Sequence, residues 1–347
     1  MKGLVKYARG DGFMEIRDVV EPAPDRGQIK IEVKAAGVCG SDLHIYHDDI
    51  DGIPINPPVI TGHEFSGVVT EVGEGVTAYK QGDRVTSETA VSFCGECVHC
   101  RTSRYNLCNN RRTLGYWYNG AFTKYTIVPQ ERIHRLPDDM DYITGAQLEP
   151  LACTVRAVME LTTIKAGDVV LVSGPGAIGL MAMQVAKAEG AIVVVSGTNS
   201  GSFDRLALAK KLGADYTVNA KTEDLKAFIN DLTQGRGVDV VLECSGAQQA
   251  VNDGLVLTRK FGQYTQIALL GKPISVDFEK IVYRELKVTG SIGSTWSAWE
   301  KGIELVTSGK VNSKILVSDV MPITEWEAAF KKFEKKEGLK LVLTPVD

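Results

Sequence analysis

The sequence has no long hydrophobic run and no large excess of charge of either sign. The longest nearly uncharged run, residues 169–186, contains Pro175 and three glycines, which suits a strand, a turn and a helix better than a membrane span. The segment Met1–Lys6 lacks the apolar core of a signal peptide. A formal net charge of -4 gives no electrostatic reason to expect nucleic acid or an anionic membrane as the main partner.

Low-complexity tracts are also missing, and the cysteine content does not suit a disulfide framework. Of the 347 residues, 44% are hydrophobic and 24% are charged, which is ordinary for a globular protein. A chain of this length exceeds one typical core, so we expect two domains. The seven cysteines are odd in number, and four of them lie within residues 94–108. This clustering favours metal over disulfides and therefore a reducing compartment, so we expect a cytoplasmic protein. From the net charge we expect neither nucleic acid nor membrane as partner.

Two kinds of pattern divide the chain. Residues 1–147 are mostly β in character, with period-two alternation at 28–35 and 68–72 and frequent turn signals. From residue 148, predicted strands at 169–173, 192–196, 216–218, 238–243, 263–268 and 286–289 alternate with predicted helices at 178–189, 204–212 and 223–232. Such alternation is typical of the α/β class with a doubly wound parallel sheet. The tail predicts helices at 299–308 and 326–335 and a strand at 339–343.

The first strand of the α/β region leads into a glycine-rich turn and then an apolar helix. The turn is a GxGxxG motif made of Gly174, Pro175, Gly176, Ala177, Ile178 and Gly179. The first glycine permits the tight turn, the second lets a pyrophosphate approach the backbone, and the third lets the helix pack close to the strand. The helix N-terminus then presents free N–H groups to the phosphates. In this setting the motif predicts a dinucleotide site, and the alternative is a tight turn in a non-binding α/β domain.

The end of the second strand bears on the choice of cofactor. An NAD-preferring site carries an acid there, which bonds the ribose 2′-OH, but this sequence has Gly197. Gly197 is followed by small, mostly polar residues: Thr198, Asn199, Ser200, Gly201 and Ser202. Arg205 comes shortly after them. Such donors suit a 2′-phosphate. We therefore expect NADP(H) in preference to NAD(H), and the alternative is a solvated loop in an enzyme that takes either cofactor.

Four cysteines form a tight cluster in the β-rich region. Cys94, Cys97, Cys100 and Cys108 have the spacing C-x2-C-x2-C-x7-C, and four thiolates so close in sequence predict a closed, structural zinc site. His99 lies inside the cluster, where we expect it to be exposed rather than ligating. Nearby arginines would also fit a nucleic-acid zinc ribbon: Arg101, Arg104, Arg111 and Arg112. The long remainder of the chain and the acidic balance argue against that alternative.

A second pair of metal-ligand residues lies on two glycine-flanked turns. Cys39 and His63 supply a thiolate and an imidazole, both of which suit zinc. Two ligands do not close a tetrahedral site, and a catalytic zinc keeps one position open. We therefore expect a further acid, a cofactor and a route for a proton. The alternative is that Cys39 is a small buried hydrophobe and His63 a hydrogen-bonded core residue.

Taken together, the motifs resemble the zinc-dependent medium-chain dehydrogenases, in the branch with polyol (sorbitol-type) and threonine dehydrogenases. The resemblance is carried by residues 37–44, 62–64, the four-cysteine lobe, 149–152 and 174–179, in the order usual for the family. It implies a GroES-like catalytic domain from residues 1–147 and 290–347 and a Rossmann NAD(P)-binding domain from 148–289. It also implies a homodimer or homotetramer and two zinc ions per chain, one catalytic and one structural.

The resemblance also implies roles for individual residues. Cys39 and His63 match the permanent ligands of the catalytic zinc, and Glu149 matches the acid that supplies the third ligand directly or through water. Glu64 matches a neighbouring acid that can enter or leave the coordination shell, although a buried salt bridge is an equal alternative. Ser41 and His44 match a relay in which a hydroxyl, the cofactor ribose and an imidazole carry the alcohol proton away, and their alternative is a capped turn with an exposed histidine. A metal with an open position acts as a Lewis acid on the substrate oxygen.

The predicted reaction is hydride transfer between a secondary alcohol and NAD(P), which interconverts alcohol and ketone. We expect a polyol or sugar-like substrate, with a threonine-type amino alcohol or a general secondary alcohol as alternatives. Residues 290–296 contain no arginine, unlike polyol dehydrogenases of the family. A zinc-free quinone or enoyl reductase and a non-catalytic nucleotide-binding protein are the rival interpretations. Candidate residues of the substrate pocket are Tyr46, His47, Asp48, Tyr116, Trp117 and Tyr118.

Overall fold

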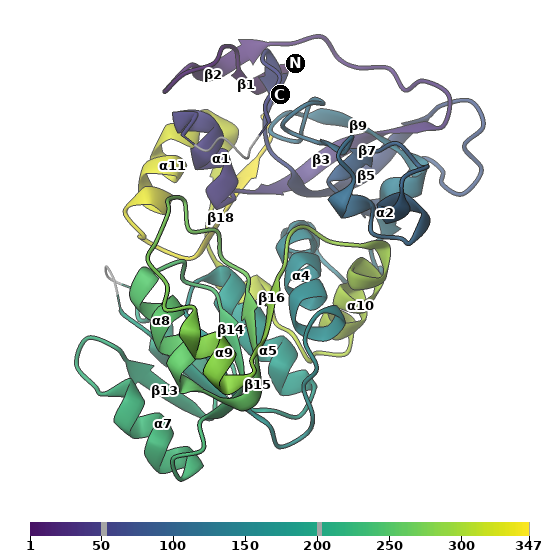
Figure 1. Ribbon diagram of the computed structural model, residues 1–347. Coiled ribbons are helices and arrows are strands. Elements are labelled where there is room, and N and C mark those ends of the chain that lie inside the picture. Colours follow the sequence, from purple (N-terminus) through teal and green to yellow (C-terminus); the bar gives the residue numbers. More distant parts are fainter. Residues whose placement is uncertain (50–53, 200–202, 347) are drawn as a thin grey trace. The chain divides into compact units, whose positions relative to one another are not determined.

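The computed structural model describes residues 1–49, 54–199 and 203–346 and divides into two compact units (Figure 1). Unit 1 comprises Met1–Pro150, Ser294–Ile303 and Ser313–Asp347, and unit 2 comprises Leu151–Gly293 and Glu304–Asn312. The domain boundaries after residues 147 and 289 stay a prediction; the units divide after Pro150 and Gly293, and Glu304–Asn312 groups with unit 2. No helix of the described residues is long and apolar enough to cross a membrane.

Unit 1 is built on β-sheet, as the period-two patterns predict. Its main sheet has seven strands in the described residues, in the order β10-β6-β5-β3-β18-β17 with β9 also paired to β3. These strands are β3 (Gln28–Gly37), β5 (Glu64–Val72), β6 (Arg84–Ser87), β9 (Tyr125–Pro129), β10 (Ile133–Arg135), β17 (Val317–Pro322) and β18 (Lys340–Thr344). Smaller sheets are formed by β1 (Lys2–Lys6), β2 (Met14–Asp18) and β4 (Val59–Ile60), and by β7 (Ala90–Ser92) and β8 (Arg112–Thr113).

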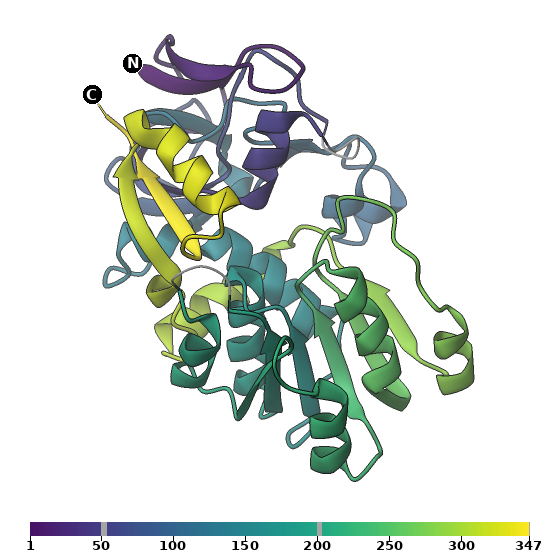
Figure 2. The ribbon, with the colours of Figure 1, turned by 90° about the vertical axis from the view of Figure 1, so that its left-hand side faces the viewer.

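The C-terminal strand completes this sheet. β18 pairs antiparallel with β3, with Val342 opposite Gly37 and Leu343 opposite Ala36, so unit 1 contains both ends of the chain. Figure 2 shows α11 (Trp326–Glu334) beside β17 and β18. Along β3, Ile29, Ile31 and Val33 are buried in the core. Burial of each such side chain contributes about 1.5–3 kcal/mol, which keeps β3 at the centre of the sheet.

Short helices complete unit 1 and place its loops. They are α1 (Gly40–His47), α2 (Val98–Arg101), α3 (Tyr142–Ala146), the start of α4 (Leu148–Val155) and the first part of α10 (Trp296–Thr307). α1 packs against α11 through edge-to-face contacts of Tyr46 with Trp326 and Phe330. The sequence patterns did not predict α1, because eight residues are too few for a clear helical period.

Unit 2 contains the predicted doubly wound sheet. Six parallel strands have the order β13-β12-β11-β14-β15-β16 in the described residues, which is the Rossmann order. They are β11 (Val169–Ser173), β12 (Ile192–Gly197), β13 (Tyr216–Asn219), β14 (Val238–Glu243), β15 (Thr258–Gln266) and β16 (Lys287–Gly290). All six predicted strands are confirmed, although β15 begins earlier than expected because Val238 already pairs with Thr258 ahead of a register shift.

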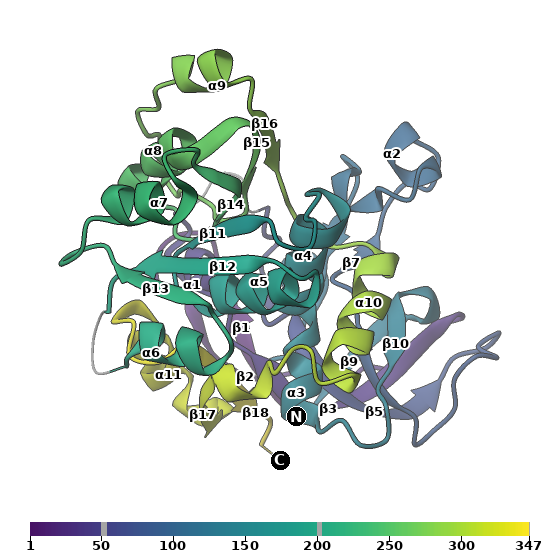
Figure 3. The ribbon, with the colours of Figure 1, turned by 90° about the horizontal axis from the view of Figure 1, so that it is seen from below.

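Helices cover both faces of the parallel sheet, as Figure 3 shows: α5 and α6 lie on one face and α7 and α8 on the other. They are α5 (Ala177–Ala188), α6 (Arg205–Lys211), α7 (Leu225–Thr233), α8 (Gln248–Leu257) and the short α9 (Glu279–Arg284). The first three match predicted helices, whereas α8 and α9 were missed. β11 has all five residues buried, which is what a strand covered on both faces requires.

His47 ties three distant segments of unit 1 together and gives a pH-dependent prediction. Its Nδ1 lies 2.8 Å from Asp11 Oδ1 and its Nε2 lies 2.6 Å from Glu334 Oε1. The hydrogen bond to Glu334, with a further one to Asp11, raises the pKa of His47 above its ordinary value. A raised pKa in the folded state contributes stability below about pH 6.5, and this is lost as the pH rises through the folded-state pKa.

We therefore expect His47→Gln to lower the unfolding midpoint in urea more at pH 6 than at pH 8.5. The measurement is the difference in midpoint between wild type and variant across this range. An equal difference at both pH values would show that protonated His47 contributes no stability.

Candidate active site

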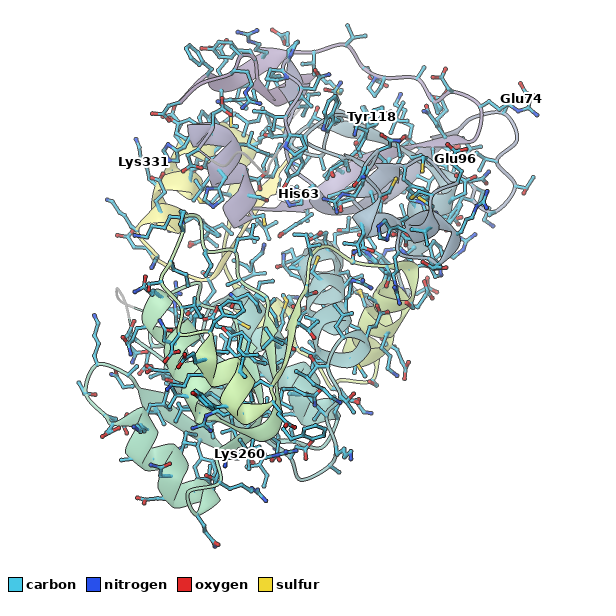
Figure 4. The ribbon with its side chains drawn as sticks, in the orientation of Figure 1. His63, Glu74, Glu96, Tyr118, Lys260 and Lys331 are labelled. Carbon is cyan, nitrogen blue, oxygen red and sulfur yellow. The ribbon has the colours of Figure 1, made fainter. Side chains whose placement is uncertain are left out.

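Three predicted metal ligands meet in unit 1. One potential ligand atom each of Cys39, His63 and Glu64 lies within 4.8 Å of the other two. Atoms that share a zinc ion at about 2.0–2.3 Å are at most about 4.6 Å apart, so this grouping is close to the spacing zinc requires. Figure 4 labels His63 in the chain between β4 and β5.

Strand pairing is what brings the three residues together. β3 and β5 run antiparallel with Gly37 opposite Glu64. Cys39 therefore follows the end of β3 close to where His63 precedes β5, and it forms the N-cap of α1. A side chain at position 37 would collide with the Glu64 carboxylate. Only glycine leaves room for Glu64 at this point.

His63 is buried beside a second carboxylate that the sequence analysis missed. Asp42 Oδ1 lies 3.6 Å from His63 Nδ1, and Asp42 Oδ2 accepts a 2.9 Å hydrogen bond from the Cys39 backbone N–H. Burial lowers the pKa of His63, but interactions with Tyr116 and Asp42 outweigh it, so this pKa lies well above its ordinary value. The surroundings thus favour positive charge. A carboxylate behind a ligand histidine orients the ring for a metal.

Glu64 is held from behind by a buried lysine. Lys340, on β18, forms an ion pair with Glu64 Oε2 and donates a 2.9 Å hydrogen bond to the Val38 carbonyl. Burial lowers the pKa of Lys340, but the charges of Glu64 and Cys39 raise it above its ordinary value. The other carboxylate oxygen, Glu64 Oε1, is buried without a hydrogen-bond partner in the described residues.

The group fits a zinc ion. A buried carboxylate oxygen without a partner is costly, and a cation at this point would satisfy it. Thiolate, imidazole and carboxylate are also the donor set that zinc takes in catalytic sites. Glu149 is buried near the start of α4, and its charge acts on Lys340. It lies outside the three-residue group, so its role as the third ligand stays a prediction.

The two predicted relay residues both lie on α1 but have different surroundings. Ser41 Oγ is 3.4 Å from His63 Nε2, which places this hydroxyl beside the metal-binding group. His44 lies about one helical turn further along, with its Nδ1 2.7 Å from Asp49 Oδ1 and with partial exposure to solvent. The relay itself stays a prediction.

Of the six candidate pocket residues, Tyr116 is the one placed at the metal-binding group. Its ring packs edge-on against the His63 ring at a centroid distance of 5.3 Å, and burial raises its pKa. Trp117 lies under the Arg112 guanidinium, and Tyr118 is half exposed. The other three serve packing and ion pairs: Tyr46 contacts α11, His47 bonds Asp11 and Glu334, and Asp48 pairs with Arg9.

In unit 2 the glycine-rich turn has the geometry expected from the three glycines of the GxGxxG motif. Gly174 has φ 102° and a side chain there would lie 2.8 Å from Ser245. A side chain at Gly179 would collide with the Gly174 carbonyl. Gly176 is the N-cap of α5, and nothing lies within 4 Å of where its Cβ would be. The helix N-terminus is thus open to a phosphate group.

Gly197 has a packing reason that the sequence analysis did not find. It ends β12, and a side chain there would collide with the Pro175 ring of the glycine-rich turn. Asn199 Oδ1 accepts a 3.3 Å hydrogen bond from the Leu206 backbone N–H, and burial lowers the pKa of Arg205. Thr198 follows Gly197 as expected, and Ser200, Gly201 and Ser202 lie outside the described residues.

The four cysteines of the lobe form a second metal-binding group. Their sulfur atoms all lie within 4.8 Å of one another, and the Cys97–Cys100 and Cys94–Cys108 pairs are each 3.5 Å apart. Sulfur atoms placed tetrahedrally at about 2.3 Å from zinc are roughly 3.8 Å apart. The backbone N–H groups of Cys97 and Glu96 lower the pKa of Cys94 to about 6, which favours the thiolate that binds metal, whereas burial and the neighbouring Cys97 thiol raise the pKa of Cys100. His99 is not part of this group.

Two family matches cover most of the chain. Residues 25–138 match the alcohol dehydrogenase GroES-like domain, and residues 177–308 match the zinc-binding dehydrogenase family. The solved structures include a zinc-binding dehydrogenase from Sinorhizobium meliloti bound to NADP (31% identity, TM-score 0.90) and 2R,3R-butanediol dehydrogenase from Bacillus subtilis (32% identity, TM-score 0.89). Each comparison covers 99% of both chains.

Curated relatives align over nearly their full length. Sorbitol dehydrogenase from Halalkalibacterium halodurans is 45% identical and covers 100% of both chains. D-arabitol-phosphate dehydrogenase from Enterococcus avium is 41% identical, over 99% of this chain and 97% of the relative. L-threonine 3-dehydrogenase from Bacillus subtilis is 36% identical, over 99% of each. The chain therefore belongs to the zinc-dependent medium-chain alcohol dehydrogenase family, in the branch with polyol and threonine dehydrogenases.

Proposed function

We propose that the protein transfers hydride between a secondary alcohol of the polyol or sugar-like class and NAD(P), interconverting alcohol and ketone. The observation that carries this proposal is the grouping of Cys39, His63 and Glu64, with a buried carboxylate oxygen that has no partner in the described residues. The open helix N-terminus at Gly176 supports dinucleotide binding. Cys39, His63 and Glu64, with Glu149 as the predicted further ligand, would hold a zinc ion, which would supply a Lewis acid for the alcohol oxygen.

The chain's own residues have separate tasks in this reaction. Asp42 orients the His63 ring, and Lys340 holds the Glu64 carboxylate in place. The Ser41 hydroxyl, 3.4 Å from His63 Nε2, takes up the proton of the substrate alcohol as it releases its own in the direction of His44, whose Nδ1 lies 2.7 Å from Asp49 Oδ1. An acceptor within hydrogen-bond reach of the departing proton is what such a step requires.

The polyol class has better support than the amino-alcohol alternative. The relatives that act on sorbitol and arabitol phosphate are 45% and 41% identical, against 36% for the threonine dehydrogenase. The lack of arginine in residues 290–296 keeps a general secondary alcohol as the second candidate.

The seven free cysteines support a reducing, cytoplasmic location.

The ligand role of His63 has a direct test. Replacing His63 with alanine removes a metal ligand, so turnover should fall by at least about 10³-fold and metal analysis should show one zinc per chain in place of two. Dinucleotide binding, followed by fluorescence of the reduced cofactor, should survive. His99→Ala is the matched control, and it should retain both zinc ions and turnover. Unchanged turnover in His63→Ala would refute the catalytic site, as would alcohol oxidation that survives a chelator.

The cysteine lobe holds a structural zinc in our proposal. Cys97→Ser removes one of four thiolates, so we expect the melting temperature to fall by roughly 5 °C or more with the catalytic zinc still bound. Calorimetry together with metal analysis checks this. A variant that keeps two zinc ions and the wild-type melting temperature would rule out metal binding by the lobe.

NADP(H) is the proposed cofactor. The support is the absence of an acid at the end of β12 and the polar residues that follow Gly197. Close packing against Pro175 is a second reason for a glycine at position 197, besides the choice of cofactor. We expect kcat/KM with NADP to be about ten times that with NAD. A higher kcat/KM with NAD would assign NAD as the cofactor instead.

The homodimer or homotetramer has a candidate interface on unit 2. β16 is the terminal strand of the parallel sheet in the described residues, and Val288 on it is exposed. Three apolar side chains at or near α9 are more than two thirds exposed: Phe278 at 71%, Val282 at 72% and Tyr283 at 73%. Phe278, Val282, Tyr283 and Val288 form the proposed interface patch. Exposed apolar side chains together with an unpaired edge strand are typical of an isologous interface.

Charge in this patch should break the assembly. We expect Val282→Lys with Val288→Lys to lower the mass measured by light scattering to that of a smaller species. Val20→Lys changes another exposed valine and should leave the mass unchanged. An unaltered mass in the double variant would move the interface elsewhere.

A further inference from the structure

A tyrosine and a serine both lie against His63 in the metal-binding group of unit 1. The Tyr116 ring packs edge-on against the His63 ring at a centroid distance of 5.3 Å. Ser41 Oγ itself is 3.4 Å from His63 Nε2. Two side chains that carry hydroxyl groups therefore lie against His63, where the proposed reaction places the substrate alcohol.

The backbone fixes Tyr116 firmly in this place. Its carbonyl accepts a 2.8 Å hydrogen bond from the Asn56 N–H, and the preceding Gly115 donates 2.8 Å to the Tyr118 carbonyl. Gly115 has φ 78° and packs on Gly62, the residue before His63, so closely that a side chain would lie 2.7 Å from the Gly62 carbonyl. The turn that carries Tyr116 is thus anchored to the chain segment that carries the metal ligand.

The two hydroxyl groups suit different atoms of the substrate. Ser41 is assigned to the hydroxyl that loses its proton, so the phenol is left for another polar group nearby. With an ordinary pKa of about 10, a phenol is neutral at pH 7 and both donates and accepts hydrogen bonds. A substrate with an alkyl group in place of that polar group would leave the phenol oxygen without a hydrogen-bond partner. A site built to bind a hydroxyl rejects an analogue without that hydroxyl for this reason.

We propose that Tyr116 determines specificity by binding the hydroxyl adjacent to the one that is oxidised, so that the enzyme prefers vicinal diols to simple secondary alcohols. This inference rests on the proposed function and concerns which secondary alcohols the site selects. Trp117 and Tyr118 do not compete for this role, because Trp117 packs under Arg112 and Tyr118 is half exposed.

The test compares 2,3-butanediol with 2-butanol, which differ by the second hydroxyl. In Tyr116→Phe, kcat/KM for the diol should fall by about 10–100-fold, with a change of less than about threefold for 2-butanol. A readout without turnover is calorimetric binding of the diol to zinc-loaded enzyme in the absence of dinucleotide, which should weaken in parallel. Zinc content should stay at the wild-type value, and Tyr118→Phe is the matched control.

The outcomes separate this inference from the proposed function. Equal losses for diol and mono-alcohol, or no loss for either, would overturn the role of Tyr116. A loss confined to L-threonine would also overturn it, because the phenol would then bind an amino group. A wild-type enzyme that oxidises both alcohols without preference refutes the inference alone, whereas one that oxidises no secondary alcohol refutes the proposed function.

Discussion

The antiparallel pairing of β3 with β5 is the constraint on which the metal-binding group depends. Gly37 stands opposite Glu64 in this pairing, so the end of one strand and the start of the other deliver Cys39 and His63 to the same place. A shift of one residue would reverse the faces of β5 and carry Glu64 away from the group. The glycines at 37 and 62 tolerate the close approach, since a side chain at either would strike Glu64 or Phe122.

Buried charge around the ligands makes this arrangement specific. Glu64 and Lys340 are 276 residues apart in sequence and form an ion pair with little exposure. Removing one partner of a buried pair costs about 3–5 kcal/mol. The last strand is therefore both a member of the sheet and a support for the ligand carboxylate. Asp42 has the equivalent position behind His63, with 3.6 Å between Oδ1 and Nδ1, so two of the three grouped ligands each have a charged side chain behind them.

The two metal-binding groups differ in how much structure each requires. The four cysteines of the lobe span fifteen residues, and their spacing alone predicts a closed site. The group of Cys39, His63 and Glu64 forms only when strands from separate parts of the chain are in register. This difference fits the proposed roles: the lobe stabilises its own loop, and the other group keeps a position for substrate.

Local patterns were enough to predict the parallel sheet, the glycine-rich turn and the cysteine lobe, because each is determined within a few neighbouring residues. Cys39, His63 and Glu64 were proposed from their types and from the family resemblance, and the structure groups them. Two contributions could not be predicted, since they depend on the packing of distant segments: Lys340 behind Glu64 and Asp42 behind His63. Tyr116 was a candidate pocket residue, but only the structure places its ring on His63. A lone lysine in an apolar strand was the one available signal for Lys340. Gly197 is a further example. The sequence explained this glycine by the choice of cofactor, and only the contact with Pro175 in the structure showed that packing also requires it.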